Sequence, residues 1–161
     1  MITKVWTKGY RNLKEQTFTF KEGYSQILIG NNNQGKTNFL ESLYFLVHAK
    51  SPTEGNRNNL INFKKNTAIV GVEFLLDETF HKAYIKLTKE GSIYFYYKNK
   101  EYRSTKEIKK AVNIEYISSD IVRLFQEAPS QRRHYLDHFC SQYFDDYKKT
   151  LNKYSSVLKQ K

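Results

Sequence analysis

The sequence predicts an α/β fold built around a phosphate-binding loop. One segment, Gly30–Thr37, fits the pattern G-x-x-x-x-G-K-[ST]. An apolar run leads into this segment, and apolar residues at helical spacing follow it. Farther along, residues 67–98 alternate between apolar and polar side chains, which indicates an antiparallel β-meander.

The elements before and after the glycine loop are predicted from their periodicity. Ile2–Thr7 and Thr17–Phe20 alternate like short strands, and the polar residues between them indicate a turn. Tyr24–Ile29 is predicted to be a third strand that runs directly into Gly30. The helix after the loop is predicted from apolar residues spaced three or four apart: Phe39, Leu40, Leu43, Leu46 and Val47.

The middle of the chain reads as a loop followed by the meander. Residues 51–66 are polar, and we expect a surface loop anchored by Leu60, Ile61 and Phe63. Residues 67–76 form the first predicted meander strand, a turn follows at 77–79, and further strands are predicted at 81–87 and 92–98. The first of these strands is expected to place five side chains on one face: Ala68, Val70, Val72, Phe74 and Leu76.

The C-terminal third is predicted to be mainly helical. Ser104 and Glu107 have the spacing of a capping box at the start of a short helix, and residues 114–118 read as a short strand. From Ser130 onward one long amphipathic helix is predicted, running to the last residue. Its apolar positions are Leu136, Phe139, Tyr143, Tyr147, Leu151, Tyr154 and Leu158.

The composition is that of a basic, folded domain. The chain has 161 residues, of which 39% are hydrophobic and 16% aromatic, enough to form a core. Lys and Arg number 27 against 16 Asp and Glu, a formal net charge of +11. This balance favours a polyanionic partner, nucleic acid first and anionic membrane second, although charge also serves solubility.

Segments for export or membrane insertion are not apparent, so a cytoplasmic protein with no membrane partner is expected. The single cysteine, Cys140, excludes an intrachain disulfide and suits a reducing compartment. Its neighbours Phe139, Tyr143 and Phe144 indicate a core position.

The glycine loop has the chemistry of a P-loop NTPase. Gly30 and Gly35 let the backbone fold tightly, so that successive N–H groups and the following helix N-terminus face an anion. Lys36 can reach the β- and γ-phosphates, and the Thr37 hydroxyl can ligate Mg²⁺. We therefore predict ATP and Mg²⁺ as cofactors and nine nucleotide-binding residues: Gly30, Asn31, Asn32, Asn33, Gln34, Gly35, Lys36, Thr37 and Asn38.

A catalytic carboxylate is harder to find. The stretch FLLDE, Phe74–Glu78, resembles the acidic end of a Walker B strand. Its strand alternates as a half-exposed antiparallel strand does, whereas a buried parallel strand is a continuous apolar run, so a turn is the favoured interpretation. No LSGGQ-like signature is present. We assign no catalytic residue, and whether the chain is an enzyme stays open.

Four stretches carry a family resemblance: GYRN (9–12), GNNNQGKTNFLESLYFL (30–46), HAKSP (48–52) and APSQRRHYLDHF (128–139). Together they resemble the N-terminal part of the bacterial RecF recombination-mediator ATPases, which are related to SMC-type heads in the ABC superfamily. The first two stretches are shared by SMC-like heads, and the last one distinguishes RecF.

The resemblance implies an ABC/SMC-type head with two lobes. It places lobe I at residues 1–129, with the P-loop at 30–37 and the meander at about 67–98, and the start of a helical arm at 130–161. The second lobe, with the signature and Walker B acids, is expected outside this chain, which would make the chain a truncated product or a fragment. Arg11 and Asn12 match the segment that approaches the nucleotide.

The resemblance also implies a function, in recombinational repair, replication restart and the SOS response. Family members bind single-stranded DNA and duplex near gaps as an ATP-dependent dimer, are weak DNA-dependent ATPases, and have RecR and RecO as partners. Beside Thr37, Asp120 is the nearest candidate for a metal contact, with a solvated loop aspartate as the alternative.

A basic, aromatic stretch offers candidate DNA contacts. Between Lys86 and Lys110 eight basic residues stand against three acidic ones, interleaved with tyrosines. The candidates are Lys98, Lys100, Arg103, Lys106, Lys109 and Lys110. The alternative is a two-faced strand whose aromatics fill the core and whose lysines face solvent. Arg133 and Asp137 are spaced for a structural ion pair.

Other functions stay open at this point. The chain could be a lobe that binds nucleotide or DNA without hydrolysis, or an unrelated P-loop phosphotransferase such as a small-molecule kinase. An ABC transporter subunit is disfavoured by the RecF-like segment 128–139 and by the basic charge.

Overall fold

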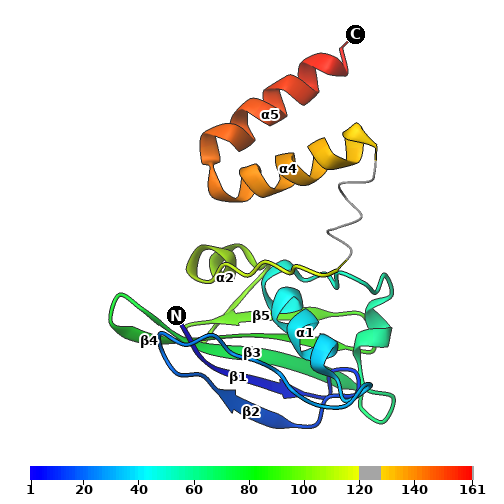
Figure 1. Cartoon of the computed structure of the whole chain (residues 1–161), viewed down its shortest axis with the longest axis vertical. Helices are drawn as coiled ribbons and strands as arrows, with labels where there is room; N and C mark the ends of the chain where they lie inside the picture. The colour runs from blue at the N-terminus through cyan, green and yellow to red at the C-terminus, as the bar shows by residue number, and fades with distance from the viewer. Residues whose placement is uncertain (120–127, 161) are drawn as a thin grey trace. The chain divides into compact units, whose positions relative to one another are not determined.

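The computed structural model describes residues 1–119 and 128–160 (Figure 1). The chain divides into two compact units, Met1–Tyr116 and Ile117–Lys161, each described here by itself. The predicted boundary at residue 129 stays a prediction, since it adjoins the residues that the structure leaves undescribed. Among the described residues, no helix is both long and apolar enough to cross a membrane.

The first unit is built on one antiparallel sheet with the strand order β2-β1-β3-β4-β5-β6. The strands are β1 (Ile2–Lys8), β2 (Gln16–Thr19), β3 (Thr67–Leu76), β4 (Thr79–Thr88), β5 (Ile93–Tyr97) and β6 (Lys100–Tyr102). The predicted meander is confirmed as β3, β4 and β5. The pairing of β1 with β3, about 65 residues apart in sequence, was not predicted and joins both groups of strands into one sheet.

The β3–β4 hairpin decides the interpretation of the FLLDE stretch. Asp77 and Glu78 are the two turn residues, with φ of 48° and 59°. Positive φ at both central residues matches the right-handed twist of the flanking strands in a tight hairpin. The two acids therefore lie in an antiparallel turn, as predicted, and not at the end of a buried parallel strand.

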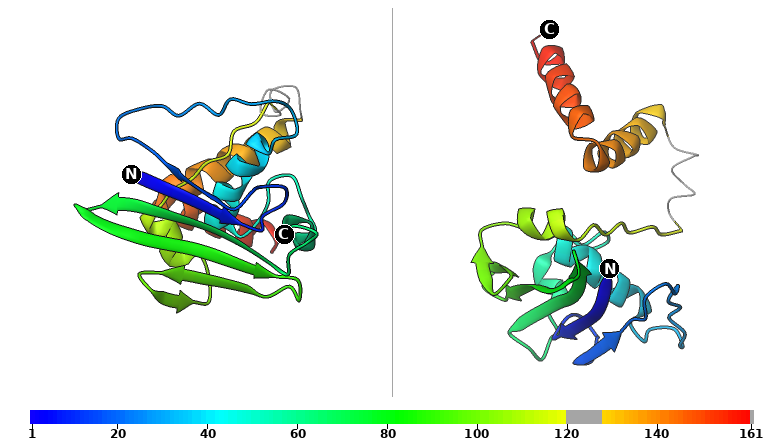
Figure 2. Two further views of the ribbon diagram at one scale, coloured as in Figure 1. Left: turned by 90° about the horizontal axis from the view of Figure 1, so that it is seen from below. Right: turned by 90° about the vertical axis from the view of Figure 1, so that its left-hand side faces the viewer.

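The core lies between one face of the sheet and helix α1 (Lys36–His48), with α2 (Lys106–Ala111) on the same side (Figure 2). Alternate residues of β3 point into this core, as predicted. The helix contributes Phe39, Phe45 and Leu46, and α2 contributes Ile108. Leu40, which was also predicted for the apolar face of the helix, is exposed. The result is a two-layer α/β unit whose helix begins directly after the glycine loop.

Two predicted strands are absent from the described residues. Tyr24–Ile29 is extended but pairs with no strand, and Tyr24, Ile27 and Ile29 are 73%, 81% and 91% exposed. Residues 114–118 likewise form no strand. Apolar character alone cannot make a strand, because its N–H and C=O groups need a neighbouring strand as partner.

The loop before β3 is anchored by two of its three predicted residues. Leu60 ends a 3₁₀ helix, η1 (Arg57–Leu60), and both Leu60 and Ile61 are buried. Backbone bonds from Arg11 N to Leu60 O (2.9 Å) and from Asn62 N to Gly9 O (2.9 Å) fix this position. Phe63 lies beyond these bonds and is 94% exposed, so its prediction as an anchor was wrong.

The predicted capping box does not form. The residue before α2 is Thr105, which makes no side-chain capping bond, and Ser104 Oγ accepts only a long bond from Lys106 N at 3.4 Å. Glu107 pairs with Lys110 at 3.0 Å instead of reaching back to the backbone. The lysine one turn later outcompetes the backbone N–H for the carboxylate.

The second unit contains two helices where one was predicted, α4 (Pro129–Tyr143) and α5 (Asp145–Leu158). Phe144 interrupts them with φ −128° and ψ 103°, in the extended region. Acidic residues are favoured in the first turn of a helix, so Asp146 was the sequence signal for a new helix start.

The surroundings of Asp137 and Cys140 on α4 differ from those predicted from the sequence. Tyr147 Oη donates to Asp137 Oδ1 at 2.5 Å, and no ion pair joins Asp137 to Arg133 among the residues described. Cys140 is half-buried on α4 and does not lie in a core. The hydrogen bond from Tyr147 to Asp137 joins α5 to α4 across the break at Phe144.

Gly71 offers a direct test of the sheet packing. A Cβ at this position would lie 2.0 Å from Trp6 Cζ2. We expect Gly71→Ala to lower the free energy of unfolding by about 1–3 kcal/mol, because the indole must move off the sheet. Urea unfolding monitored by circular dichroism measures this.

Gly55→Ala is the matched control, since a Cβ there meets nothing within 4 Å. Its stability should be unchanged or raised by up to about 1 kcal/mol. Equal stability of the two variants would contradict the packing of Trp6 on Gly71.

Candidate functional site

The glycine loop leads into the N-terminus of α1. Gly35 precedes the helix with φ 93° and ψ 13°, in the left-handed region that glycine adopts without strain. No side chain caps the helix at this end. The first N–H groups of a helix have no partner within it, and the helix dipole makes this end positive. The loop therefore presents backbone donors suited to an anion.

Lys36 is folded back into the loop. Its Nζ donates to Gly30 O and to Asn31 O, both at 2.8 Å. Asn31 N in turn donates to Gln34 Oε1 at 3.2 Å, so the loop closes on its own side chains. A lysine held by two carbonyls in the concavity of the loop is placed to exchange them for phosphate oxygens.

An open pocket of about 650 Å³ lies beside the loop. Its lining is polar and consists of Asn12, Asn32, Asn33, Gly35, Lys36, Thr37 and Asn38. One ammonium, one hydroxyl and several amides meet here at a helix N-terminus, and the described residues that line the pocket include no carboxylate. This donor set fits a polyphosphate.

Asn12 braces the loop from the turn between β1 and β2. Its Nδ2 donates to Asn33 O at 2.9 Å, and its Oδ1 accepts from Asn38 Nδ2 at 2.8 Å. Its Oδ1 would also lie 2.9 Å from a Cβ at Gly35. Asn12 thus holds both sides of the helix start, and only glycine fits at position 35.

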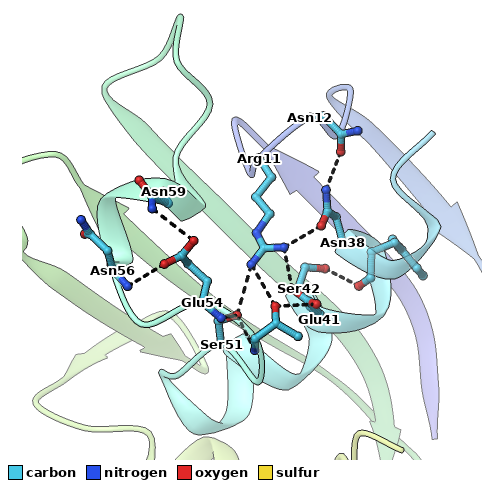
Figure 3. Close-up of polar contacts among 11 residues, drawn as sticks. Arg11, Asn12, Asn38, Glu41, Ser42, Ser51, Glu54, Asn56 and Asn59 are labelled. Atoms are coloured by element: carbon cyan, nitrogen blue, oxygen red, sulfur yellow. Dashed lines mark hydrogen bonds and ion pairs between the residues drawn. The ribbon is translucent and has the colours of Figure 1, made fainter. Parts of the chain in front are cut away.

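Arg11 lies beside this brace and connects three segments (Figure 3). One guanidinium nitrogen, Nη1, lies 2.7 Å from Asn38 Oδ1 and 2.7 Å from Glu41 Oε2. The other, Nη2, donates to Ser51 Oγ at 3.3 Å and Thr53 Oγ1 at 3.4 Å. The side chain therefore ties α1 to the loop that follows it.

The partner of Arg11 is a buried carboxylate. The Glu41 side chain is 2% exposed and that of Arg11 18%. Thr53 Oγ1 donates to Glu41 Oε1 at 2.8 Å, while Oε2 has only the ionic contact with Arg11. Burying a charged carboxylate costs free energy unless it is paired with a cation, and Arg11 is the cation that offsets this cost for Glu41.

Tyr10 is buried close to this pair. Its hydroxyl has no hydrogen-bond partner among the described residues. Burial raises the pKa of the Tyr10 phenol well above its usual range, with a smaller opposing effect from Arg11. Tyr10 therefore stays neutral and does not compete with Glu41 for the guanidinium.

The predicted site residues fall into three groups. The loop residues Gly30–Asn38 lie together with Arg11 and Asn12, and their binding of nucleotide stays a prediction. Asp120 lies outside the described residues. The six candidate DNA contacts are all exposed and lie on the β5–β6 turn, β6, the loop after β6 and α2, apart from the glycine loop in sequence: Lys98, Lys100, Arg103, Lys106, Lys109 and Lys110.

Sequence reasoning missed the role of Glu41, Ser51 and Thr53. A signal was available for the first of them. Glu41 stands one turn before the buried Phe45, on the apolar side of the helix, where an acid requires a cation. The two hydroxyls carried no such signal, because they come from a loop whose path sequence does not predict.

Comparison with known proteins agrees with this geometry. The family described as AAA domain matches residues 4–160. The DNA replication and repair protein RecF of Clostridium beijerinckii is 31% identical over 150 residues, which are 93% of this chain and 41% of that protein. The chain thus spans about two-fifths of the length of this relative.

Comparison with solved structures also finds similarity to a RecF protein. A structure of the recombination mediator protein RecF with ATP, from the RecFOR pathway, matches with a TM-score of 0.75 and 27% identity, covering 99% of this chain and 43% of that one. A structure from work on ATP-driven dimerization and DNA-stimulated activation of SMC ATPases matches with a TM-score of 0.70 and 20% identity, covering 84% and 97%. The second match shows a shared head fold only.

The Arg11–Glu41 pair generates a stability prediction. Arg11→Ala should lower the free energy of unfolding by about 3–5 kcal/mol, because it leaves a buried carboxylate unpaired. Chemical denaturation measures this. Lys110→Ala removes an exposed ion pair and should cost less than about 1 kcal/mol.

A cost for Arg11→Ala as small as that for Lys110→Ala would show that Arg11 is not needed to stabilise Glu41. Arg11 would then be available for the nucleotide contact predicted from the sequence.

Proposed function

The chain belongs to the AAA-domain family and to the RecF family, of which it matches the N-terminal region. On this premise we propose that it binds ATP·Mg²⁺ and DNA. The observation that carries the proposal is the uncapped N-terminus of α1, with Lys36 folded into a pocket braced by Asn12. A phosphate chain satisfies the donors that this arrangement leaves open.

Each loop residue has a role in the proposed complex. Lys36 exchanges its two carbonyl partners for phosphate oxygens, and the backbone donors of residues 31–37 surround the phosphates. Thr37 provides its hydroxyl to Mg²⁺, which would neutralise phosphate charge. Asn12 and Asn38 keep the helix start in place, and Arg11 holds Asn38.

Binding without turnover is the function proposed for this chain alone. Among the described residues no carboxylate that could orient a water for attack lines the pocket, and Asp77 and Glu78 are turn residues of the β3–β4 hairpin. Hydrolysis would then require groups from outside these residues, consistent with a lobe whose signature and Walker B acids come from elsewhere. This is the binding-module alternative, and the lack of an acid among the described residues of the pocket favours it.

The DNA-binding part of the proposal rests on charge. Lys100, Arg103 and Lys106 are exposed on neighbouring elements, and the whole chain carries +11. Lysine and arginine neutralise backbone phosphates without reading sequence. By family resemblance we propose a cytoplasmic role in recombinational repair, replication restart and the SOS response. The partners would be gapped and single-stranded DNA, a second copy, RecR and RecO.

Nucleotide binding is tested by calorimetric titration of the chain with ATP·Mg²⁺. We expect saturable binding with no appreciable release of phosphate. Lys36→Ala should weaken binding about tenfold or more, because it removes a charge-assisted hydrogen bond to phosphate. Thr37→Ala should reduce the gain in affinity that Mg²⁺ provides.

Lys153→Ala, an exposed lysine on α5, is the charge-matched control and should leave the affinity unchanged. Lys36→Ala binding as tightly as the unaltered chain would overturn the proposed site. Robust hydrolysis by the unaltered chain would overturn the proposal of binding without turnover.

DNA binding is tested through its salt dependence. The double variant Lys100→Gln with Lys106→Gln should weaken DNA binding. It should also reduce the slope of log K against log salt by about 1.4–1.8, since each phosphate contact contributes about 0.7–0.9. Fluorescence anisotropy with labelled DNA at several salt concentrations measures both. An unchanged slope would exclude these two lysines from the contact.

A further inference from the structure

The sheet of the first unit has a second face that the proposed sites do not use. Helices α1 and α2 both lie on the other side of the sheet (Figure 2). Residues that alternate with the buried core residues point away from these helices. A solvent-facing sheet surface normally carries polar side chains, yet several of the residues here are aromatic.

The aromatic residues of this face stand in one row across four strands. The strand register aligns Trp6 with Gly71, Gly71 with Tyr84, and Tyr84 with Tyr96. Trp6 lies over the bare Gly71, where a Cβ would lie 2.0 Å from its ring. Tyr84 and Tyr96 stack with ring centroids 4.4 Å apart and an interplanar angle of 14°. The rings are partly exposed, so their outer surfaces stay accessible.

A hydrogen bond keeps the end of the row in place. Tyr96 Oη donates to Glu101 Oε2 at 2.7 Å on the neighbouring strand β6. This bond raises the pKa of Tyr96 to about 12, so the phenol stays neutral. Glu101 is thereby engaged with the tyrosine.

Two lysines lie over this surface. Lys82 Nζ lies 4.8 Å from the centroid of the Trp6 ring, and Lys86 Nζ lies 6.0 Å from that of Tyr94. Neither forms an ion pair with a carboxylate in residues 1–119 or 128–160. The nearby acid Glu73 is paired with Lys4 at 2.8 Å. The face therefore combines partly exposed rings with two lysines that have no acidic partner in the described parts of the chain.

We propose that this outer aromatic face, formed by Trp6, Tyr84, Tyr94, Tyr96, Lys82 and Lys86, binds single-stranded nucleic acid. Unpaired bases stack on the rings, and the two lysines contact the adjoining phosphates. Duplex fits poorly, because its bases are already stacked and paired. The inference rests on the proposed DNA-binding function and assigns the single-stranded contact to a surface other than α2.

Cross-strand aromatic pairs also stabilise sheets without any ligand. The two lysines distinguish a purely structural row from a surface that binds single-stranded nucleic acid. A purely structural row needs no cation, whereas Lys82 and Lys86 lie over rings with no carboxylate partner and would complement a polyanion.

Trp6 provides a direct test, because it is the only tryptophan in the chain. Its fluorescence is recorded while oligo(dT) is added to the full 161-residue chain, with an equal length of duplex as the comparison. We expect oligo(dT) to quench Trp6 and to protect it from acrylamide, and duplex to do neither. Unchanged emission and acrylamide access at saturating oligo(dT) would overturn the inference.

Variants separate this inference from the function on which it rests. Lys82→Gln with Lys86→Gln, and separately Tyr84→Thr with Tyr96→Thr, should weaken oligo(dT) binding about tenfold and duplex binding less than twofold. Circular dichroism confirms that each variant is folded. Lys100→Gln with Lys106→Gln, the α2-side variant, should instead weaken both ligands.

Three other results of these experiments would overturn the inference, and they differ in what they imply for the proposed DNA binding. Oligo(dT) binding lost only in the α2-side variant overturns the inference and leaves the proposed DNA binding intact. No DNA binding by the unaltered chain overturns both. A change in Trp6 emission with protein concentration alone, without DNA, would mean that a second copy covers this face, and would also overturn the inference.

Discussion

The buried carboxylate of Glu41 is the constraint on which the rest of the nucleotide site depends. It lies on the inner side of α1, where an unpaired charge would not be tolerated, and the guanidinium of Arg11 is its counter-ion. This pairing fixes the turn after β1 against the helix. Because Asn12 follows Arg11, the same turn places its amide under the glycine loop, where it holds Asn33 and Asn38. Stability and site geometry thus have a common origin in one ion pair.

The described part of the site offers groups that suit phosphate binding. Its helix N-terminus, ammonium and hydroxyl converge on one pocket, and no carboxylate is among the described residues that line it. The chain also spans only 41–44% of the RecF proteins that it matches. Both facts fit a lobe that holds nucleotide while the groups for turnover come from elsewhere.

Sequence predicted the parts of this fold that local periodicity determines. The alternation of β3, the helix after Gly35 and the turn at Asp77 were all found, because each depends on neighbouring residues. The capping box at Ser104 and the unbroken C-terminal helix were local errors, and other errors came from contacts distant in sequence. Strand formation at 24–29 needed a pairing partner, and the burial of Leu60 but not Phe63 depended on backbone bonds to Gly9 and Arg11. For the site, the loop chemistry was readable from its motif. The counter-ion of Arg11 required the fold, because Glu41 lies 30 residues away.

The central claim is that nucleotide phosphates bind at the start of α1, in the pocket that Asn12 braces. The most direct measurement is an NMR titration of the isotope-labelled chain with ATP·Mg²⁺, following every backbone amide. The account predicts that the largest shifts fall on residues 30–38, with smaller ones at Arg11 and Asn12. Shifts that spare this loop and gather elsewhere, or none at saturating nucleotide, would contradict it.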